Sequence, residues 1–135
     1  MSRREIREHI FLLLFRADFF AAAEMAEQVD FYFTTEEGEA ALAAVDYIRT
    51  KLLRIVANLT EIDNVLTEKI EGWGINRIGK VDLAILRLAA YEIIYDDDIP
   101  QRVAINEAVE LAKKFGQDNS KAFVNGVLAK FPMKG

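Results

Sequence analysis

The spacing of apolar positions predicts helices along the whole chain, with no alternating stretch typical of a β-strand. Ser2 and Glu5 have the spacing of a capping box, so a first helix is expected to begin almost at the N-terminus. The apolar face of this helix repeats every three or four residues, at Ile6, Ile10, Leu13, Leu14 and Ala17. The first predicted element is therefore an amphipathic helix.

Three more helices are predicted before residue 71. The second covers 19–33, and Thr34 with Glu37 is expected to cap a longer third helix that reaches residue 59. The apolar stripe of this third helix is too short for a sustained coiled coil, so we favour a seam within one bundle over a dimer. Thr60 is expected to cap the fourth helix. That helix ends before the glycines of 72–74, the best position for a subdomain boundary.

The segment from Val81 to Tyr95 is apolar on almost every side. Only three of its fifteen residues are charged: Asp82, Arg87 and Glu92. Such a helix must be surrounded by other helices or by membrane, and it is short for a bilayer, which needs about 20 residues. We therefore predict a buried central helix, in which Arg87 needs a partner.

Two amphipathic helices follow, over 103–115 and from 120 to 131. Gly116 is expected to end the first, and Asp118 or Ser120 to cap the second. Gly126 lies inside the second helix, where glycine costs about 1 kcal/mol relative to alanine. It is therefore expected to permit a close helix contact or the close approach of a ligand. The aspartates of 96–98 lack the ligand spacing of a calcium loop, so we predict a solvated turn.

Composition narrows the possible functions. The chain has 135 residues, enough for one domain with a real core, and contains no cysteine, which excludes disulfides and cysteine-based metal sites. The only histidine, His9, is expected to be structural, and no catalytic constellation stands out. The apolar run after Arg3 and Arg4 is too short and too soon interrupted by charge for a signal peptide, and no segment reaches transmembrane length. These features favour a cytoplasmic protein that is not an enzyme.

A line of basic and then aromatic side chains runs along the first helix: Arg4, Arg7, Phe11 and Phe15. Such a line could hold a phosphate at one end and stack a base at the other. Alternatively, the phenylalanines widen the core face and the arginines are solvated. The net charge is −5, and residues 17–71 carry four basic and twelve acidic side chains. Binding of a nucleic acid would therefore depend on this local basic face and on a basic partner.

Several ordered motifs resemble the NusB family of bacterial transcription antitermination factors. They are ILRLAAYE at 85–92, the Asp98-Ile99-Pro100 turn, VAINEAVELAKKFG at 103–116 and FVNGVL at 123–128. The arginine-rich start is also similar, and the resemblance is dense over 73–131 and looser over 17–71. It implies an all-α fold of about seven helices in two packed helical-bundle subdomains, 1–72 and 73–135.

The resemblance also implies a function. Members of the family bind boxA RNA in nascent ribosomal RNA transcripts together with ribosomal protein NusE, and they help to load other Nus factors on RNA polymerase. No cofactor, metal or catalysed reaction is implied. The RNA-binding residues that the family implies are Arg3, Arg4, Arg7, Phe15, Asp82, Arg87 and Phe123, to which we add Lys121 for its charge and its nearness to Phe123. Phe15 stands where the family usually has a tyrosine, so it keeps a stacking face and loses a hydroxyl.

Other interpretations stay open at this point. One alternative is a helical interaction module that binds only protein and has lost its RNA face. NusB-like domains also precede RNA methyltransferase domains, but no cofactor-binding domain follows in these 135 residues. The phenylalanine line could instead support a homodimer. Arg87 could contact RNA or form an internal ion pair.

Overall fold

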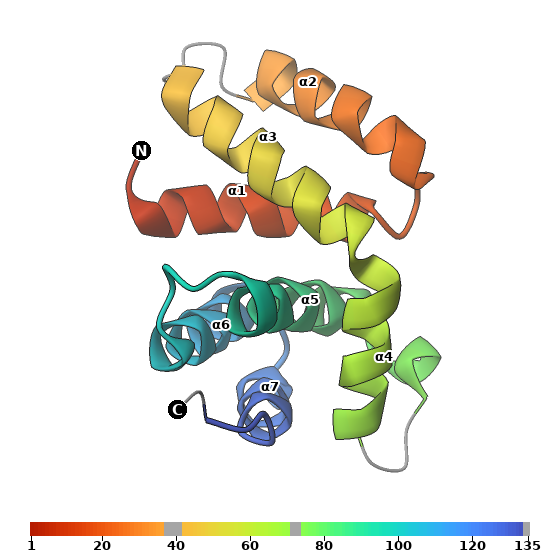
Figure 1. Cartoon of the computed structure of the whole chain (residues 1–135), viewed down its shortest axis with the longest axis vertical. Helices are drawn as coiled ribbons and strands as arrows, with labels where there is room; N and C mark the ends of the chain where they lie inside the picture. The colour runs from red at the N-terminus through yellow and green to blue at the C-terminus, as the bar shows by residue number, and fades with distance from the viewer. Residues whose placement is uncertain (37–41, 71–73, 134–135) are drawn as a thin grey trace. The chain divides into compact units, whose positions relative to one another are not determined.

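The computed structural model describes residues 1–36, 42–70 and 74–133, and over them it contains α-helices and no strand (Figure 1). The helices are α1 (Arg3–Arg16), α2 (Met25–Glu36), α3 (Leu42–Ala57), α4 (Leu59–Lys69), α5 (Lys80–Tyr95), α6 (Gln101–Phe115) and α7 (Ser120–Leu128). Two single-turn 3₁₀-helices, η1 (Ala22–Glu24) and η2 (Ile75–Arg77), precede α2 and α5. The all-α fold class predicted from the sequence is confirmed.

The chain divides into two compact units, Met1–Asn58 and Leu59–Gly135. The first contains α1 to α3 and the second α4 to α7. Helix α4 belongs to the second unit because it packs on α5 and α7. The sequence placed a boundary at the glycines of 72–74, and residues 71–73 lie outside the described part of the chain. The subdomains 1–72 and 73–135 stay a prediction.

In the first unit, α1 packs on α3 and α2, and α2 packs on α3. The predicted apolar face of α1 supplies much of the core, because Ile10, Leu13 and Leu14 are buried. Phe11 is only 2% exposed, so it widens this core face and is not placed to stack a base. An ion pair between Arg49 and Asp30 joins α3 to α2 at the surface. The Thr34 and Glu37 capping pattern lies outside the described side chains.

Helix α1 begins with the predicted capping box. The Ser2 hydroxyl accepts a hydrogen bond from the Glu5 N–H at 3.1 Å, and the Glu5 carboxylate accepts one from the Ser2 N–H at 3.2 Å. Hydrogen bonds to the Glu5 carboxylate, first from the Ser2 backbone and then from the Ser2 side chain, hold the pKa of Glu5 below its ordinary value. The first turn, which carries Arg3 and Arg4, is therefore fixed by local contacts.

Ser2→Ala is expected to lower the free energy of unfolding by about 1 kcal/mol, because it removes the side-chain cap. Since the pKa of Glu5 is lowered in the folded state, the stabilisation from its carboxylate is present above the ordinary glutamate pKa, about 4.3. It is lost as the pH falls through the lowered folded-state value. Urea unfolding of wild type and variant at neutral and acidic pH measures both effects. The variant keeps the backbone N–H that bonds the Glu5 carboxylate, so only the part of the difference that comes from the Ser2 hydroxyl should shrink in acid. No shrinkage at all would contradict the coupling between this hydroxyl and Glu5.

Several predicted helix starts are wrong. Helix α2 begins at Met25 and not near Phe19, because Ala21 is extended and its N–H donates to the Glu24 carboxylate at 2.8 Å. Phe19 lies before this break and is 60% exposed. Helix α4 begins one residue before the predicted Thr60 cap. The side-chain capping signals were therefore weaker guides than the apolar stripes.

The end of the chain also differs from the prediction. The N-cap of α7 is Asn119, and the Ser120 hydroxyl instead accepts from the Gln117 N–H at 2.9 Å. Helix α7 stops at Leu128, short of the predicted Phe131. Phe131 still packs in the core, at 5% exposure. The apolar stripe therefore predicted the burial of Phe131 and missed the end of the helix.

In the second unit, α5 is the central helix that the sequence predicted. Every residue from Leu83 to Ile93 is buried, and α4, α6 and α7 all pack on it. Within the described residues, no helix combines the length and the hydropathy of a membrane span. Gly126 on α7 is exposed, and a Cβ placed there would have no neighbour within 4 Å. The close helix contact predicted for Gly126 is therefore wrong.

Candidate RNA interface

The basic cluster at the start of α1 has two exposed members. Arg3 and Arg4 lie on the first turn, which the capping box holds, and both side chains are exposed. Arg7 lies one turn later and is 9% exposed. Arg3 and Arg4 are therefore the guanidinium groups of this cluster that a phosphate can reach without a rearrangement of α1.

Phe15 lies near the other end of α1 and is half-buried. Its ring packs against Phe19, with 5.5 Å between ring centroids. Leu12, Phe19 and Phe20 are exposed beside it in the chain. Because the Phe15 ring already has an aromatic neighbour, its role in stacking a base stays a prediction.

His9 has a structural position in the first unit, as the sequence predicted. Its Nδ1 lies 2.6 Å from the Tyr32 hydroxyl, and its ring packs T-shaped with Tyr32 and at a tilt with Phe33. The Arg16 guanidinium lies 5.2 Å from the centre of the Tyr32 ring on the same pair of helices. These contacts join α1 to α2 through aromatic packing and a hydrogen bond.

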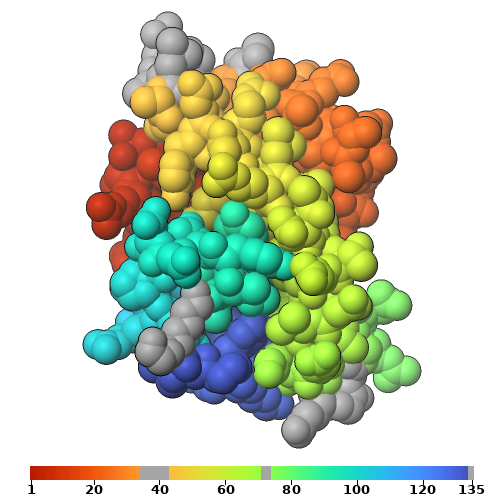
Figure 2. Space-filling view, viewed as in Figure 1, coloured from red at the N-terminus to blue at the C-terminus, as the bar shows by residue number. Residues whose placement is uncertain are grey.

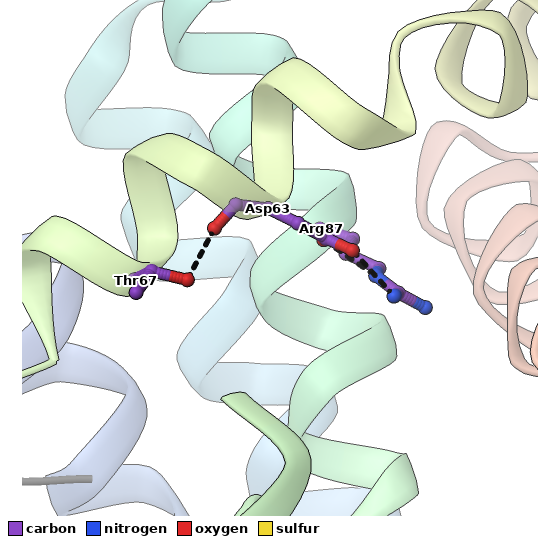
Figure 3. A network of polar contacts seen from close by, with 3 residues as sticks. All are labelled: Asp63, Thr67 and Arg87. Atoms are coloured by element: carbon purple, nitrogen blue, oxygen red, sulfur yellow. Dashed lines mark hydrogen bonds and ion pairs between the residues drawn. The ribbon is translucent and has the colours of Figure 1, made fainter. Parts of the chain in front are cut away.

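Arg87 forms an ion pair inside the second unit. Its Nε donates to Asp63 Oδ1 at 2.9 Å and its Nη2 donates to Asp63 Oδ2 at 2.7 Å. The Arg87 residue is 8% exposed, and Asp63 lies on the facing helix α4 (Figure 3). The Thr67 hydroxyl donates to the Asp63 backbone oxygen at 2.7 Å. This two-pronged geometry is the strong form of an arginine–carboxylate contact.

The sequence left Arg87 open between an RNA contact and an internal pair, and the structure contains the internal pair. The sequence did not identify Asp63 as the partner. Asp63 directly follows Ile62 of the apolar stripe of α4, which is a signal for a carboxylate at the edge of the core. Choosing it over other acidic residues would have needed the register of α4 against α5.

The other predicted residues of the second unit lie on two helices. Asp82 is half-buried in the first turn of α5. It precedes Arg87 by five positions, which is roughly 140° around a helix, so the two side chains leave α5 in different directions. On α7, Lys121 is exposed and Phe123 is half-buried. Positions two apart do not share a helix face, so Lys121 is not a direct neighbour of the Phe123 ring along α7.

The described residues contain no group of three acidic or histidine side chains that could hold a metal ion. In the turn after α5, Asp96 Oδ1 accepts from the Asp98 N–H at 3.1 Å, which is a local turn contact. The predicted RNA residues are divided between the units, with Arg3, Arg4, Arg7 and Phe15 in the first and Asp82, Arg87, Lys121 and Phe123 in the second. A joint surface formed by the two sets stays a prediction.

The family model described as the NusB family matches residues 4–132. The chain belongs to the NusB family. The match includes all the predicted RNA residues except Arg3, which lies just before it.

Two curated NusB relatives align with nearly the whole chain, and both are named transcription antitermination protein NusB. The protein from Lachnoclostridium phytofermentans is 52% identical over 130 residues, covering 96% of this chain and 98% of the relative. The protein from Agathobacter rectalis is 51% identical over 137 residues, covering 97% and 99%.

Solved structures agree with the NusB fold. A solved structure described as T. maritima NusB is 34% identical to this chain. The TM-score is 0.84, and the match covers 96% of this chain and 89% of that one. A chain in the crystal structure of a plectonemic RNA supercoil is 28% identical with a TM-score of 0.78, covering 94% and 91%. The NusB fold of this chain is therefore supported by sequence and by structure.

Proposed function

We propose that this NusB-family chain is a transcription antitermination factor. It binds boxA-type single-stranded RNA in nascent ribosomal RNA transcripts, together with ribosomal protein NusE, in the cytoplasm. The pair helps to assemble other Nus factors on RNA polymerase, by binding and without a cofactor or a catalysed reaction. Support comes from the near-complete alignment with relatives named for transcription antitermination.

The structural observation that carries this proposal is the pair of exposed guanidinium groups at the start of α1. Arg3 and Arg4 are presented by a capped helix, so little conformational freedom of the backbone is lost when they meet a phosphate. Two accessible arginines in a chain of net charge −5 should give weak, salt-sensitive affinity for RNA alone. A basic partner such as NusE would complete the site.

A second candidate function is that of a module that binds only protein. It is favoured by the burial of the other two predicted RNA-binding arginines, Arg7 and Arg87. Arg7 is 9% exposed, and Arg87 is 8% exposed and bonded to Asp63. If both stay in these positions, the cationic surface available to RNA is small. The two functions differ in whether RNA binding appears when NusE is present.

Fluorescence anisotropy with boxA RNA and a scrambled RNA of equal length, each with and without NusE, separates the two functions. Antitermination predicts tighter binding of boxA RNA than of scrambled RNA, with a larger difference when NusE is present. Equal affinity for both RNAs in both conditions would overturn the proposal. Sedimentation should accompany the titration, because a homodimer formed through Leu12, Phe19 and Phe20 would also reduce RNA binding.

Arg3→Ala and Arg4→Ala should each weaken boxA binding. Each should also make the slope of log affinity against log salt concentration shallower by about 1, as expected for the loss of one phosphate contact. Arg54→Ala is the matched control, because Arg54 is an exposed arginine on α3 of the same unit. The control should retain the wild-type salt slope. Equal losses in all three variants would indicate general electrostatics and contradict a local RNA contact.

Phe123→Ala should weaken binding of boxA RNA more than that of scrambled RNA, because a stacked base contributes about 1–3 kcal/mol. The half-buried ring also packs within the second unit, so thermal unfolding must accompany the titration. Loss of the fold in place of loss of RNA preference would assign Phe123 to packing.

A further inference from the structure

The turn that follows α1 carries an exposed aromatic ring, that of Phe19, which is 60% exposed. The Phe19 N–H donates to the Arg16 backbone oxygen at 2.8 Å, and the Ala17 N–H donates to the Leu14 backbone oxygen at 3.0 Å. These hydrogen bonds span three residues each and extend the end of α1 into the turn. The backbone that carries the Phe19 ring is therefore held in place.

The Phe19 ring packs against the ring of Phe15 on α1. The two centroids are 5.5 Å apart, and the ring planes meet at 53°. Because the rings are tilted, a planar base that lies flat on one of them cannot lie flat on the other. Phe15 is half-buried and Phe19 is exposed, so Phe19 is the ring that a base can cover. Phe15 then supports the ring beside it.

The aromatic pair shares a helix face with an arginine. Arg4 precedes Phe15 by eleven positions, which places the two residues about 20° apart around the α1 axis and roughly 16 Å apart along it. The beginning of α1, coloured red, reaches the surface of the first unit, and Arg4 is exposed there (Figure 2). A single-strand binding site commonly holds about four nucleotides or more, enough to extend over this distance. One strand can therefore contact Arg4 through a phosphate and Phe19 through a base.

The charged groups near the rings determine which part of an RNA strand lies there. Asp18 adjoins Phe19 in the chain, and Glu8 lies on the same face of α1; both are half-buried. The Arg16 guanidinium is engaged with α2, where it lies 5.2 Å from the centre of the Tyr32 ring. Carboxylates repel a phosphate, whereas an uncharged base stacks on an aromatic ring without a cation beside it. The surroundings of the rings thus favour a base.

The size of the aromatic surface also favours a base over a protein partner. Two phenylalanine side chains together offer about 300–500 Å², and Leu12, one turn before Phe15, adds only a partly exposed side chain. Each partner in a stable protein complex buries roughly 800 Å². A stacked base needs one ring face, which Phe19 supplies.

We propose that a base of single-stranded RNA stacks on Phe19, with Phe15 as the positioning residue that supports its ring. This inference rests on the proposed RNA binding, and it adds to that site a residue that the family resemblance did not imply. The tyrosine hydroxyl that Phe15 lacks is not needed for this role, because Phe15 acts through its ring.

Phe19→Leu should weaken binding of boxA RNA, measured with NusE present, about fivefold or more, since it keeps an apolar side chain and loses the stacking surface. Phe19→Trp keeps a ring and should bind at least as tightly as wild type. Phe31→Leu is the matched control, because Phe31 on α2 of the same unit is also 60% exposed. Equal losses in the two leucine variants, or no loss in Phe19→Leu, would overturn the inference.

BoxA RNAs that carry a single abasic nucleotide identify the stacked base. At one position, removal of the base should weaken binding to wild type and leave binding to Phe19→Leu unchanged, because ring and base form one contact. The absence of any such position would overturn the inference. A wild-type preference for boxA over scrambled RNA that Phe19→Leu leaves intact would refute this inference alone, whereas loss of that preference in wild type would refute the proposed function.

Two further measurements identify a protein as the occupant. Phe19→Leu should bind NusE in the absence of RNA as tightly as wild type does, and sedimentation should give the same mass for both proteins. A weaker contact with NusE would assign the ring to a protein interface, and a change of mass would assign it to contact between two copies of this chain. Either result would overturn the stacking role.

Discussion

Asp63→Ala is expected to lower the free energy of unfolding by about 3 kcal/mol, the largest effect predicted for a single change in this chain. The substitution removes both acceptors of the Arg87 Nε and Nη2 groups, at 2.9 and 2.7 Å. Arg87 is 8% exposed in the middle of α5, so water cannot fully replace the lost carboxylate. Urea unfolding followed by circular dichroism measures the change.

The matched control is Thr67→Ala, one turn further along α4. The Thr67 hydroxyl donates to the backbone oxygen of Asp63 and not to its carboxylate, so its loss should change the stability by less than about 1 kcal/mol (Figure 3). Comparable losses in Asp63→Ala and Thr67→Ala would contradict a dominant role for the ion pair.

A double variant separates the two halves of the ion pair. Replacing both members with apolar side chains, Asp63→Leu with Arg87→Met, should recover much of the stability that Asp63→Ala loses, because neither charge of this pair is then left without its partner. RNA affinity measured on this variant also tests the predicted RNA role of Arg87. If boxA binding is retained without the guanidinium, Arg87 is structural.

Gly116→Ala is expected to lower the free energy of unfolding by about 2 kcal/mol. A Cβ at this position would lie 2.6 Å from both Cβ and Oγ of Ser120 and 2.8 Å from the Ala112 backbone oxygen. The backbone at Gly116 is extended, with φ −92° and ψ −169°, so the expected cost comes from contact and not from φ. Thermal or urea unfolding measures this loss.

Gly126→Ala is the matched control for this change. Gly126 lies inside α7, and a Cβ there would meet nothing within 4 Å, so alanine should raise the stability by about 1 kcal/mol through helix propensity. The two glycine-to-alanine changes are therefore expected to have opposite signs. A destabilising Gly126→Ala would mean that α7 has a closer neighbour in solution than the described residues include.

The sequence predicted helices where an apolar stripe extends over several turns. Ile10, Leu13 and Leu14 of α1 and the almost continuous apolar run of α5 are examples, because periodic burial is a property of many residues together. Helix starts were less predictable. Thr60 and Ser120 resemble capping residues, yet α4 begins at Leu59, and α7 begins after Asn119 with no side-chain cap hydrogen bond.

The candidate site was predictable in part. The exposure of Arg4 follows from a capped first helix whose apolar face lies on the other side, which the sequence contains. Arg3, seven residues before Ile10, lies on the side of the apolar face and is exposed because it stands at the first turn. Residue spacing alone does not predict that Arg7 is buried. It also does not predict that the ring of Phe15 packs against the ring of Phe19. Both features depend on which elements pack beside α1.

By itself, the sequence determined the all-α class, the central position of α5, the capping box and the requirement that Arg87 have a partner. These follow from periodicity, local hydrogen bonding and the cost of burying an unpaired charge. Only the tertiary structure decided that the partner of Arg87 is Asp63 and that Gly126 faces open space. Such contacts depend on the register of one helix against another, which residues far apart in the chain determine together.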